Sequence, residues 1–177
     1  MAKKISTPLT KQKTAELRAG EEVLISGVIY SARDMAHKRL TESIARSEPL
    51  PIDIEGQIIY FVGPSPAAEG RAAGSAGPTT SSRMDPFSPI LLDNGLAGMI
   101  GKGYRSDAVI NSLIKNTAVH FSAVGGAGAL LSKSIVKSEV VAYPELGPEA
   151  IHRLEVSDFP AVVAYDSTGA SIYERKK

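Results

Sequence analysis

The sequence predicts a single α/β domain built on a mixed sheet, and three observations support this fold class. Segments rich in β-branched residues alternate with segments whose apolar residues recur every three or four positions, which are the patterns of strands and amphipathic helices. The length of 177 residues suits one domain with a sizeable core. No internal repeat or linker divides the chain, so residues 1–177 are expected to form one domain, with residues 1–20 as an N-terminal arm.

The first half of the chain contains two predicted strands separated by one helix. Residues 22–30 (EVLISGVIY) predict a strand, and residues 31–34 (SARD) have the spacing of a capping box that would begin a helix. Three residues recur four positions apart on this helix and should face the core: Ala36, Leu40 and Ile44. Pro49 ends the helix, and residues 57–62 (QIIYFV) predict a second, buried strand.

A long segment rich in Gly, Ala and Pro follows this second strand. Residues 63–77 (GPSPAAEGRAAGSAG) offer nothing large enough to pack a core, so they predict a mobile surface loop. A loop of this length inside a compact domain is typically functional or disordered.

The second half of the chain returns to alternating elements. Residues 89–100 predict a short helix and a return toward the core, and residues 106–115 (SDAVINSLIK) predict an amphipathic helix capped by Ser106. The remaining predicted elements are strands at 119–124, 140–143 and 161–165, a helix of small residues at 128–134, and a turn at 167–169.

Charge and cysteine content exclude several classes of function. A formal net charge of +1 argues against a nucleic acid or a membrane held by bulk electrostatics. The absence of cysteine excludes disulfides, a cysteine nucleophile, thiolate-bound zinc and an iron–sulfur cluster held by this chain's own thiolates. No secretory signal follows Met1, and the apolar run 58–62 is far too short to cross a bilayer, so a cytoplasmic protein is expected.

Standard catalytic motifs are mostly missing. Gly101-Lys102 lacks the flanking residues of a Walker phosphate loop, and residues 125–128 (GGAG) lack the spacing of a dinucleotide fingerprint. This glycine run could present amides to an anion or permit tight helix–strand packing. The three histidines are scattered and show no metal-binding spacing, which argues against a metal site made by this chain alone: His37, His120 and His152.

A set of cations and a hydroxyl at the ends of elements is the remaining candidate site. Arg33 lies in a predicted first helical turn, where a cation opposes the helix dipole, so a bound anion would explain it. Thr79 and Arg83 are four residues apart and would share one face of a turn. Lys102 lies between two glycines, which permit close approach of a ligand. Two guanidinium groups and one ammonium group, if they converge, suit a dicarboxylate.

A simpler interpretation remains open at this point. The same cations could be ordinary surface charges paired with nearby carboxylates, namely Asp34, Asp85 and Asp93. On chemistry alone this interpretation is favoured slightly over a diacid site.

Several segments resemble one known family. Residues 77–89 (GPTTSSRMDPFSP) resemble the G-P-T-T-x-x-R-M-D signature of class I (iron–sulfur) fumarases and the related L-tartrate dehydratases. More specifically, they resemble the separate β subunit of this family, which is equivalent to the C-terminal domain of the single-chain enzymes. Residues 27–39 (GVIYSARDMAHKR) resemble the family's R-D-x-A-H-x-R segment. Three further segments fall in the family's order: 101–103, 125–128 and 154–161. The resemblance spans roughly residues 10–175.

The resemblance implies a fold, a reaction and a partner. The fold would be a swivelling β/β/α domain, and the reaction would be reversible hydration of fumarate to malate on a [4Fe–4S] cluster that acts as a Lewis acid. Because this chain has no cysteine, the cluster would be held by a separate cysteine-containing α subunit in an α2β2 or similar hetero-oligomer. The short N-terminal arm agrees with a two-chain enzyme. Dehydration of tartrate to oxaloacetate, or a non-catalytic dicarboxylate-binding or assembly module, is the alternative.

The resemblance also assigns roles to residues of this chain. Thr79 would be the catalytic base, and three cations would hold the substrate carboxylates: Arg33, Arg83 and Lys102. His37 and Asp85 match further positions of the family's motifs, and His37 could equally be a core or interface residue. Ser81-Ser82 departs from the small residues usual at this pair, which would make the loop stiffer or more polar.

Overall fold

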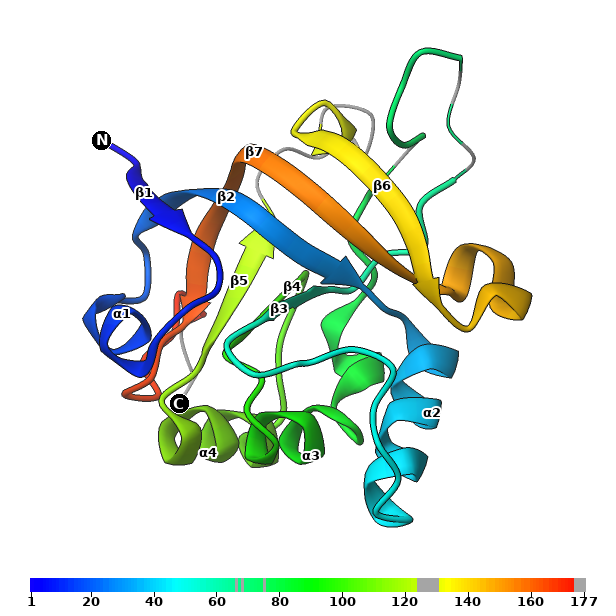
Figure 1. The fold of residues 1–177 in the computed structure, drawn as a ribbon. Helices are drawn as coiled ribbons and strands as arrows, with labels where there is room; N and C mark the ends of the chain where they lie inside the picture. The colour runs from blue at the N-terminus through cyan, green and yellow to red at the C-terminus, as the bar shows by residue number, and fades with distance from the viewer. Residues whose placement is uncertain (66, 68, 75, 124–130, 174–177) are drawn as a thin grey trace.

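Among the described residues, seven strands form one mixed sheet that closes into a barrel-like ring (Figure 1). The computed structural model describes residues 1–65, 67, 69–74, 76–123 and 131–173. The strands are β1 (Lys3–Ser6), β2 (Glu22–Ser31), β3 (Ile58–Tyr60), β4 (Gly98–Gly101), β5 (Val119–Ala123), β6 (Ile135–Ala142) and β7 (Ile151–Tyr165).

The long strand β7 closes the ring. Strands β2, β3, β4 and β5 are parallel neighbours, and β7 runs antiparallel to both β5 and β2. Its 15 residues pair along the whole of β2, from Ser31 opposite His152 to Glu22 opposite Val162. The other edge of β7 pairs first with β6 and then with β5. The carboxyl ends of β2, β3 and β4 therefore lie side by side at one end of the ring.

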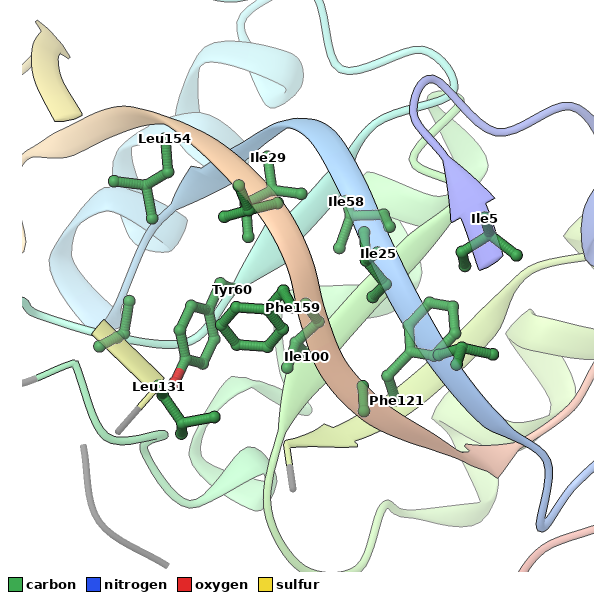
Figure 2. Close-up of a cluster of buried hydrophobic side chains, with 14 of the residues drawn as sticks. Ile5, Ile25, Ile29, Ile58, Tyr60, Ile100, Phe121, Leu131, Leu154 and Phe159 are labelled. Atoms are coloured by element: carbon green, nitrogen blue, oxygen red, sulfur yellow. The ribbon is translucent and has the colours of Figure 1, made fainter. Parts of the chain in front are cut away.

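One apolar cluster fills the inside of the ring, and a second covers its outside. Because side chains alternate along a strand, Ile58 and Tyr60 of β3 point inward, whereas Ile59 packs in the outer cluster. Inside the ring, the Tyr60 and Phe159 rings meet edge to face with centroids 5.2 Å apart (Figure 2). These side chains are fully buried, so the centre of the ring is a packed core.

The helices are α1 (Lys11–Glu16), α2 (Asp34–Ala45), α3 (Ser88–Asp93) and α4 (Asp107–Asn116), with the 3₁₀ helices η1 (Ser81–Met84) and η2 (Pro144–Glu149). Residues of α2, α3, α4 and η1 pack in the outer cluster and supply a second layer outside the sheet. The predicted stripe of α2 is confirmed, because Ala36 and Leu40 are buried and Ile44 packs against the same cluster. The predicted cap of α4 is also confirmed, since Ser106 Oγ accepts from the amide of Val109 at 3.3 Å.

The predicted capping box at the start of α2 is wrong. Strand β2 continues through Ser31, which pairs with Tyr60 and is fully buried. The Ser31 hydroxyl accepts from the amide of His152 on β7 at 3.2 Å, and the helix begins only at Asp34, so Ser31 is not its cap. Arg33 occupies the cap position and makes no side-chain capping bond. Pairing of β2 with its neighbouring strands has overridden the capping-box signal of residues 31–34.

Three further expectations about chain segments need correction. Residues 1–20 form β1 and α1, and Leu9 and Leu17 join the core, so this segment is an integral part of the sheet and its packing. Strand β7 begins ten residues before the predicted 161, because its N-terminal half is also held between β2 and β6. Strand β6 begins at Ile135, earlier than the predicted 140.

The described residues of segment 63–77 form no helix or strand, as predicted, but the segment does contribute to the core. Ala73 and Ala76 are buried in the inner cluster. The Tyr60 hydroxyl donates to the carbonyl of Ala76. Small side chains can thus cover one end of the ring where larger ones would not fit.

Part of the prediction falls outside the described residues. The glycine run 125–128 and the first three residues of the predicted helix 128–134 are among those that the structure does not describe. Within the described ranges, no helix has the length and apolar character needed to span a bilayer.

Candidate functional site

The predicted site residues gather where parallel strands β2, β3 and β4 end. Arg33 follows β2, Phe61 follows β3 and Lys102 follows β4. The amide of Ala32 donates to Tyr60 O at 3.0 Å, and the amide of Phe61 donates to Ile100 O at 2.8 Å, so the three chain ends stay together beyond the regular strands. The carboxyl ends of parallel strands are the usual place for ligands in α/β folds.

Two arginines from distant segments converge on one carboxylate. Arg83 Nη2 lies 3.0 Å from Asp34 Oδ2, and Arg33 Nε lies 4.0 Å from the same oxygen. The Arg33 side chain crosses Gly63, where a Cβ atom would approach its Cδ to 2.9 Å, so a larger residue at 63 would displace Arg33. Arg33 Nε is buried and makes no hydrogen bond within the described residues. The guanidinium groups are therefore close together and incompletely satisfied.

Backbone hydrogen bonds hold Thr79 and Lys102 in adjoining segments. The Thr79 amide donates to Phe61 O at 2.7 Å, and the Ser81 amide donates to Lys102 O at 2.8 Å. Thr80 also forms a parallel bridge with Lys102. The segment that leads into η1 is thus bonded to the ends of both β3 and β4, and η1 carries Arg83 toward α2, which it contacts.

Positive charge is in excess at this site. Asp34 is the carboxylate that faces both Arg33 and Arg83, and Lys102 forms no ion pair within the part of the chain that the structure describes. Lys102 is exposed, and half of the Arg83 side chain is exposed. Cations with free donors on an open surface can bind a small molecule that carries two carboxylates. The simpler interpretation, charge pairing with aspartates, holds for Arg83 and Asp34, but the other two aspartates pair with different cations.

Asp85 does not pair with these cations and instead forms an ion pair with the buried Arg105. Its Oδ1 accepts from Arg105 Nε at 2.7 Å, and its Oδ2 accepts from the amide of Ser106 at 2.9 Å. The Arg105 side chain is fully buried, so the Asp85 carboxylate compensates a charge inside the protein. This geometry gives Asp85 a structural task at the start of α4.

His37 is fully buried under the site. Its Nδ1 lies 2.7 Å from the carbonyl oxygen of Arg33, and its ring packs edge to face on Phe61 with centroids 5.3 Å apart. Since a carbonyl only accepts, Nδ1 carries the proton, and Nε2 is left without a hydrogen bond among the described residues. Burial lowers the pKa of His37 from 6.5 to about 4, so the ring is neutral near pH 7. His37 therefore holds the backbone of Arg33 at the start of α2.

Sequence reasoning missed the residues that anchor η1. Ser81 Oγ lies 3.2 Å from His120 Nε2, and His120 Nδ1 lies 3.3 Å from Arg105 Nη1. The only sequence signal was His120 itself, a polar residue between apolar neighbours in a predicted strand. Nothing in the local sequence indicated that Arg105 is buried.

The donor set of this chain does not fit an iron–sulfur cluster. The sequence contains no cysteine, and among the described residues no three His, Asp or Glu side chains form a group able to hold a metal ion. A cluster of the kind that the resemblance implies would need ligands from outside these 177 residues.

A cavity elsewhere contains none of the predicted site residues. It has a volume of about 440 Å³ and is lined by Leu9, Gly56, Ala97 and Thr117, among others. Gly56, Ala97 and Thr117 precede β3, β4 and β5, so this cavity lies at the opposite end of the ring from the cations. The cationic site is an exposed surface by comparison.

Fold and site together define the class: an α/β domain with a closed mixed sheet and a cationic site at the carboxyl ends of parallel strands. The family model described as the fumarase C-terminus matches residues 2–176. The chain belongs to this family, as the sequence motifs predicted.

Relatives carry this domain in two settings. Fumarate hydratase 2 of Leishmania major is 35% identical over 93% of this chain, and a class I aerobic fumarate hydratase of Salmonella typhimurium is 38% identical over 93%. The chain covers 29% of the length of each of these proteins. A putative L(+)-tartrate dehydratase subunit beta of Methanocaldococcus jannaschii is 39% identical, and the match covers 94% of this chain and 88% of the relative.

Asp85 pairs with a buried cation and Asp93 with an exposed one, and this difference predicts unequal losses of stability. We expect Asp85→Asn to lower the free energy of unfolding by about 3 kcal/mol, because it leaves the buried Arg105 charge uncompensated. The matched control is Asp93→Asn, because Asp93 pairs with Lys115 at an exposed position, 3.2 Å apart, and its loss should cost about 1 kcal/mol at most. Urea denaturation of both variants measures the difference, and equal effects would contradict the structural role of Asp85.

The buried state of His37 predicts a pH dependence of stability. With a folded-state pKa of about 4 against 6.5 in the unfolded chain, the unfolded state takes up the proton first as the pH falls. His37 should therefore weaken the fold progressively between about pH 6.5 and pH 4, by up to about 3 kcal/mol. In His37→Leu this part of the decline should be absent. Denaturation curves at several pH values in that range measure it, and a variant as acid-sensitive as the wild type would refute the assignment.

Proposed function

We propose that this chain forms one half of the active site of a two-chain hydro-lyase that reversibly hydrates fumarate to malate. One observation carries the proposal: in a chain of the fumarase C-terminal family, Arg33 and Arg83 approach the same carboxylate oxygen at the strand ends where Thr79 and Lys102 lie. These are the four residues to which the family resemblance gives roles in substrate binding and proton transfer.

The cations would bind and orient the diacid. A planar guanidinium group binds a carboxylate with two parallel hydrogen bonds, whereas an ammonium group acts as a point charge. Arg33 and Arg83 would clamp the carboxylates, and Lys102, which is exposed and lies between two glycines, would add a further positive charge. Orientation of this kind accounts for a large share of catalysis in reactions of small substrates.

Thr79 would take or return the proton at the carbon next to a carboxylate. A threonine hydroxyl is a poor base at neutral pH, so it requires cations or a partner carboxylate that stabilise its deprotonated form. When the carbon loses its proton, negative charge develops on the neighbouring carboxylate. The same arginines and lysine would stabilise this charge, and would do so more strongly in the transition state than in the ground state.

A second chain would complete the site. The cations of this chain lie on an exposed surface, and its residues do not fit a metal cluster. We propose that a cysteine-containing α subunit holds a [4Fe–4S] cluster and covers this surface in an α2β2 or similar hetero-oligomer. The match over 88% of the Methanocaldococcus subunit supports a separate β-type chain.

Tartrate is the second candidate substrate. The relative named as a putative L(+)-tartrate dehydratase subunit beta is similar to this chain in length and is 39% identical to it. A clamp made of two guanidinium groups and one ammonium group serves either diacid, so the clamp itself does not select between them.

The reaction can be tested with the complete enzyme. We expect anaerobic co-expression with the adjacent reading frame, provided that it encodes three well-spaced cysteines, to yield a complex that dehydrates malate. Assays of malate and L-tartrate on the same preparation measure the preference, and activity on tartrate alone would favour the second substrate. A complex that binds dicarboxylates and converts neither would instead identify a non-catalytic binding or assembly module.

Thr79 can be tested against its neighbour. We expect Thr79→Ala to abolish turnover, a loss of at least about 100-fold, while the fold, subunit binding and cluster content stay unchanged. The matched control is Thr80→Ala, because Thr80 is exposed and its bridge to Lys102 uses only backbone atoms. Steady-state rates, thermal unfolding and iron content of the two complexes separate the effects. Collapse of assembly in Thr79→Ala would make Thr79 structural.

A further inference from the structure

A buried arginine lies beneath the turn that carries the proposed base and clamp. The Arg105 side chain is fully buried, and its guanidinium group has four partners. Nε donates to Asp85 at 2.7 Å, Nη2 donates to Ser88 Oγ at 2.6 Å, and Nη1 lies 3.4 Å from Met99 Sδ and 3.3 Å from His120 Nδ1. A buried cation needs such partners, so each of them is held in place by it.

The arginine fixes the proton of His120. A guanidinium group has only donors, so His120 Nδ1 must accept and carries no proton. The neutral ring then has its proton on Nε2, which lies 3.2 Å from Ser81 Oγ. Burial, together with the nearby Arg105 charge, holds the pKa of His120 well below its usual value, so this arrangement persists at neutral pH. His120 therefore donates to Ser81 and accepts from Arg105.

Ser81 is held from two sides. It is the first residue of η1, two positions after Thr79 and two before Arg83. Its amide donates to Lys102 O at 2.8 Å, and its hydroxyl fills the space where Gly101 has no side chain, since a Cβ atom there would clash with Oγ. The bond from the Ser81 amide holds η1 beside the end of β4. The bond between the Ser81 hydroxyl and His120 holds the start of η1 against the buried residues beneath it.

We propose that Arg105, His120 and Ser81 are positioning residues, a buried relay of hydrogen bonds that sets where η1 presents Thr79 and Arg83 to the substrate. This inference rests on the proposed function, because it assigns the relay to the same reaction. None of the three residues needs to touch the substrate. Displacing a reacting group by about 1 Å can cost about 100-fold in rate, so loss of the Ser81 hydroxyl should change catalysis more than it changes folding.

The first test removes one hydroxyl from the complete enzyme complex. We expect Ser81→Ala to lower kcat about tenfold or more while its thermal unfolding midpoint stays close to that of Ser112→Ala. Ser112 is a matched control because it is a buried serine on α4 whose hydroxyl contacts only Asn116 among the interactions described, and its kcat should equal that of the wild type. Wild-type kcat in Ser81→Ala, or a loss of rate that follows a loss of stability, would overturn the inference.

The second test replaces His120 with each of two amide residues. It also tests the relay if Ser81→Ala does not fold. His120→Gln can place an N–H where Nε2–H lies and restore the bond to Ser81, whereas the shorter His120→Asn reaches only the position of Nδ1. We expect the glutamine variant to keep at least about five times the kcat of the asparagine variant at similar thermal stability. Equal rates would refute the relay. Inactivity of the wild-type complex toward both malate and tartrate would instead refute the proposed function, and the relay with it.

Discussion

The pairing of β7 with both β2 and β5 is the constraint on which the rest of the structure depends. Without it, β2 to β5 would be an open parallel sheet with unpaired edges. Within the closed ring, direct parallel pairing of β2 with β3 and of β3 with β4 brings their carboxyl ends together at one end. This parallel pairing makes Arg33, Phe61 and Lys102 neighbours, although 69 positions separate Arg33 from Lys102 along the chain.

Phe61 connects this constraint to the cationic surface. Its amide and carbonyl join β4 and the Thr79 segment, and its ring contacts both His37 and His120. Arg105 also lies over this ring, with Cζ 5.2 Å from the centroid. Two neutral histidines thus face one aromatic ring, and each holds a different segment of the site. A layer that is buried and hydrogen-bonded in this way resists displacement more than exposed loops do.

Local sequence predicted the elements whose signals are local. Helix α4 with its Ser106 cap and strand β2 could be recognised because propensity and capping residues agreed with the tertiary structure. The start of α2 was mispredicted because Ser31 bonds to β7, a contact between residues 121 positions apart. For the same reason sequence could nominate Arg33 and Arg83 from the family motif, but not the burial of Arg105, which depends on long-range packing.

The shared carboxylate of Arg33 and Arg83 has a consequence for the thermodynamics of recognition. Long side chains on a surface normally give up rotamer freedom when a ligand arrives, at about 0.5 to 1.5 kcal/mol each. Asp34 Oδ2 lies 3.0 Å from Arg83 Nη2, so this ion pair would reduce the freedom that the Arg83 guanidinium group has left to lose. The intramolecular carboxylate acts as an occupant of the same chemical kind as the expected ligand. Association would then be an exchange of one carboxylate for another, with little ordering of the protein left to complete.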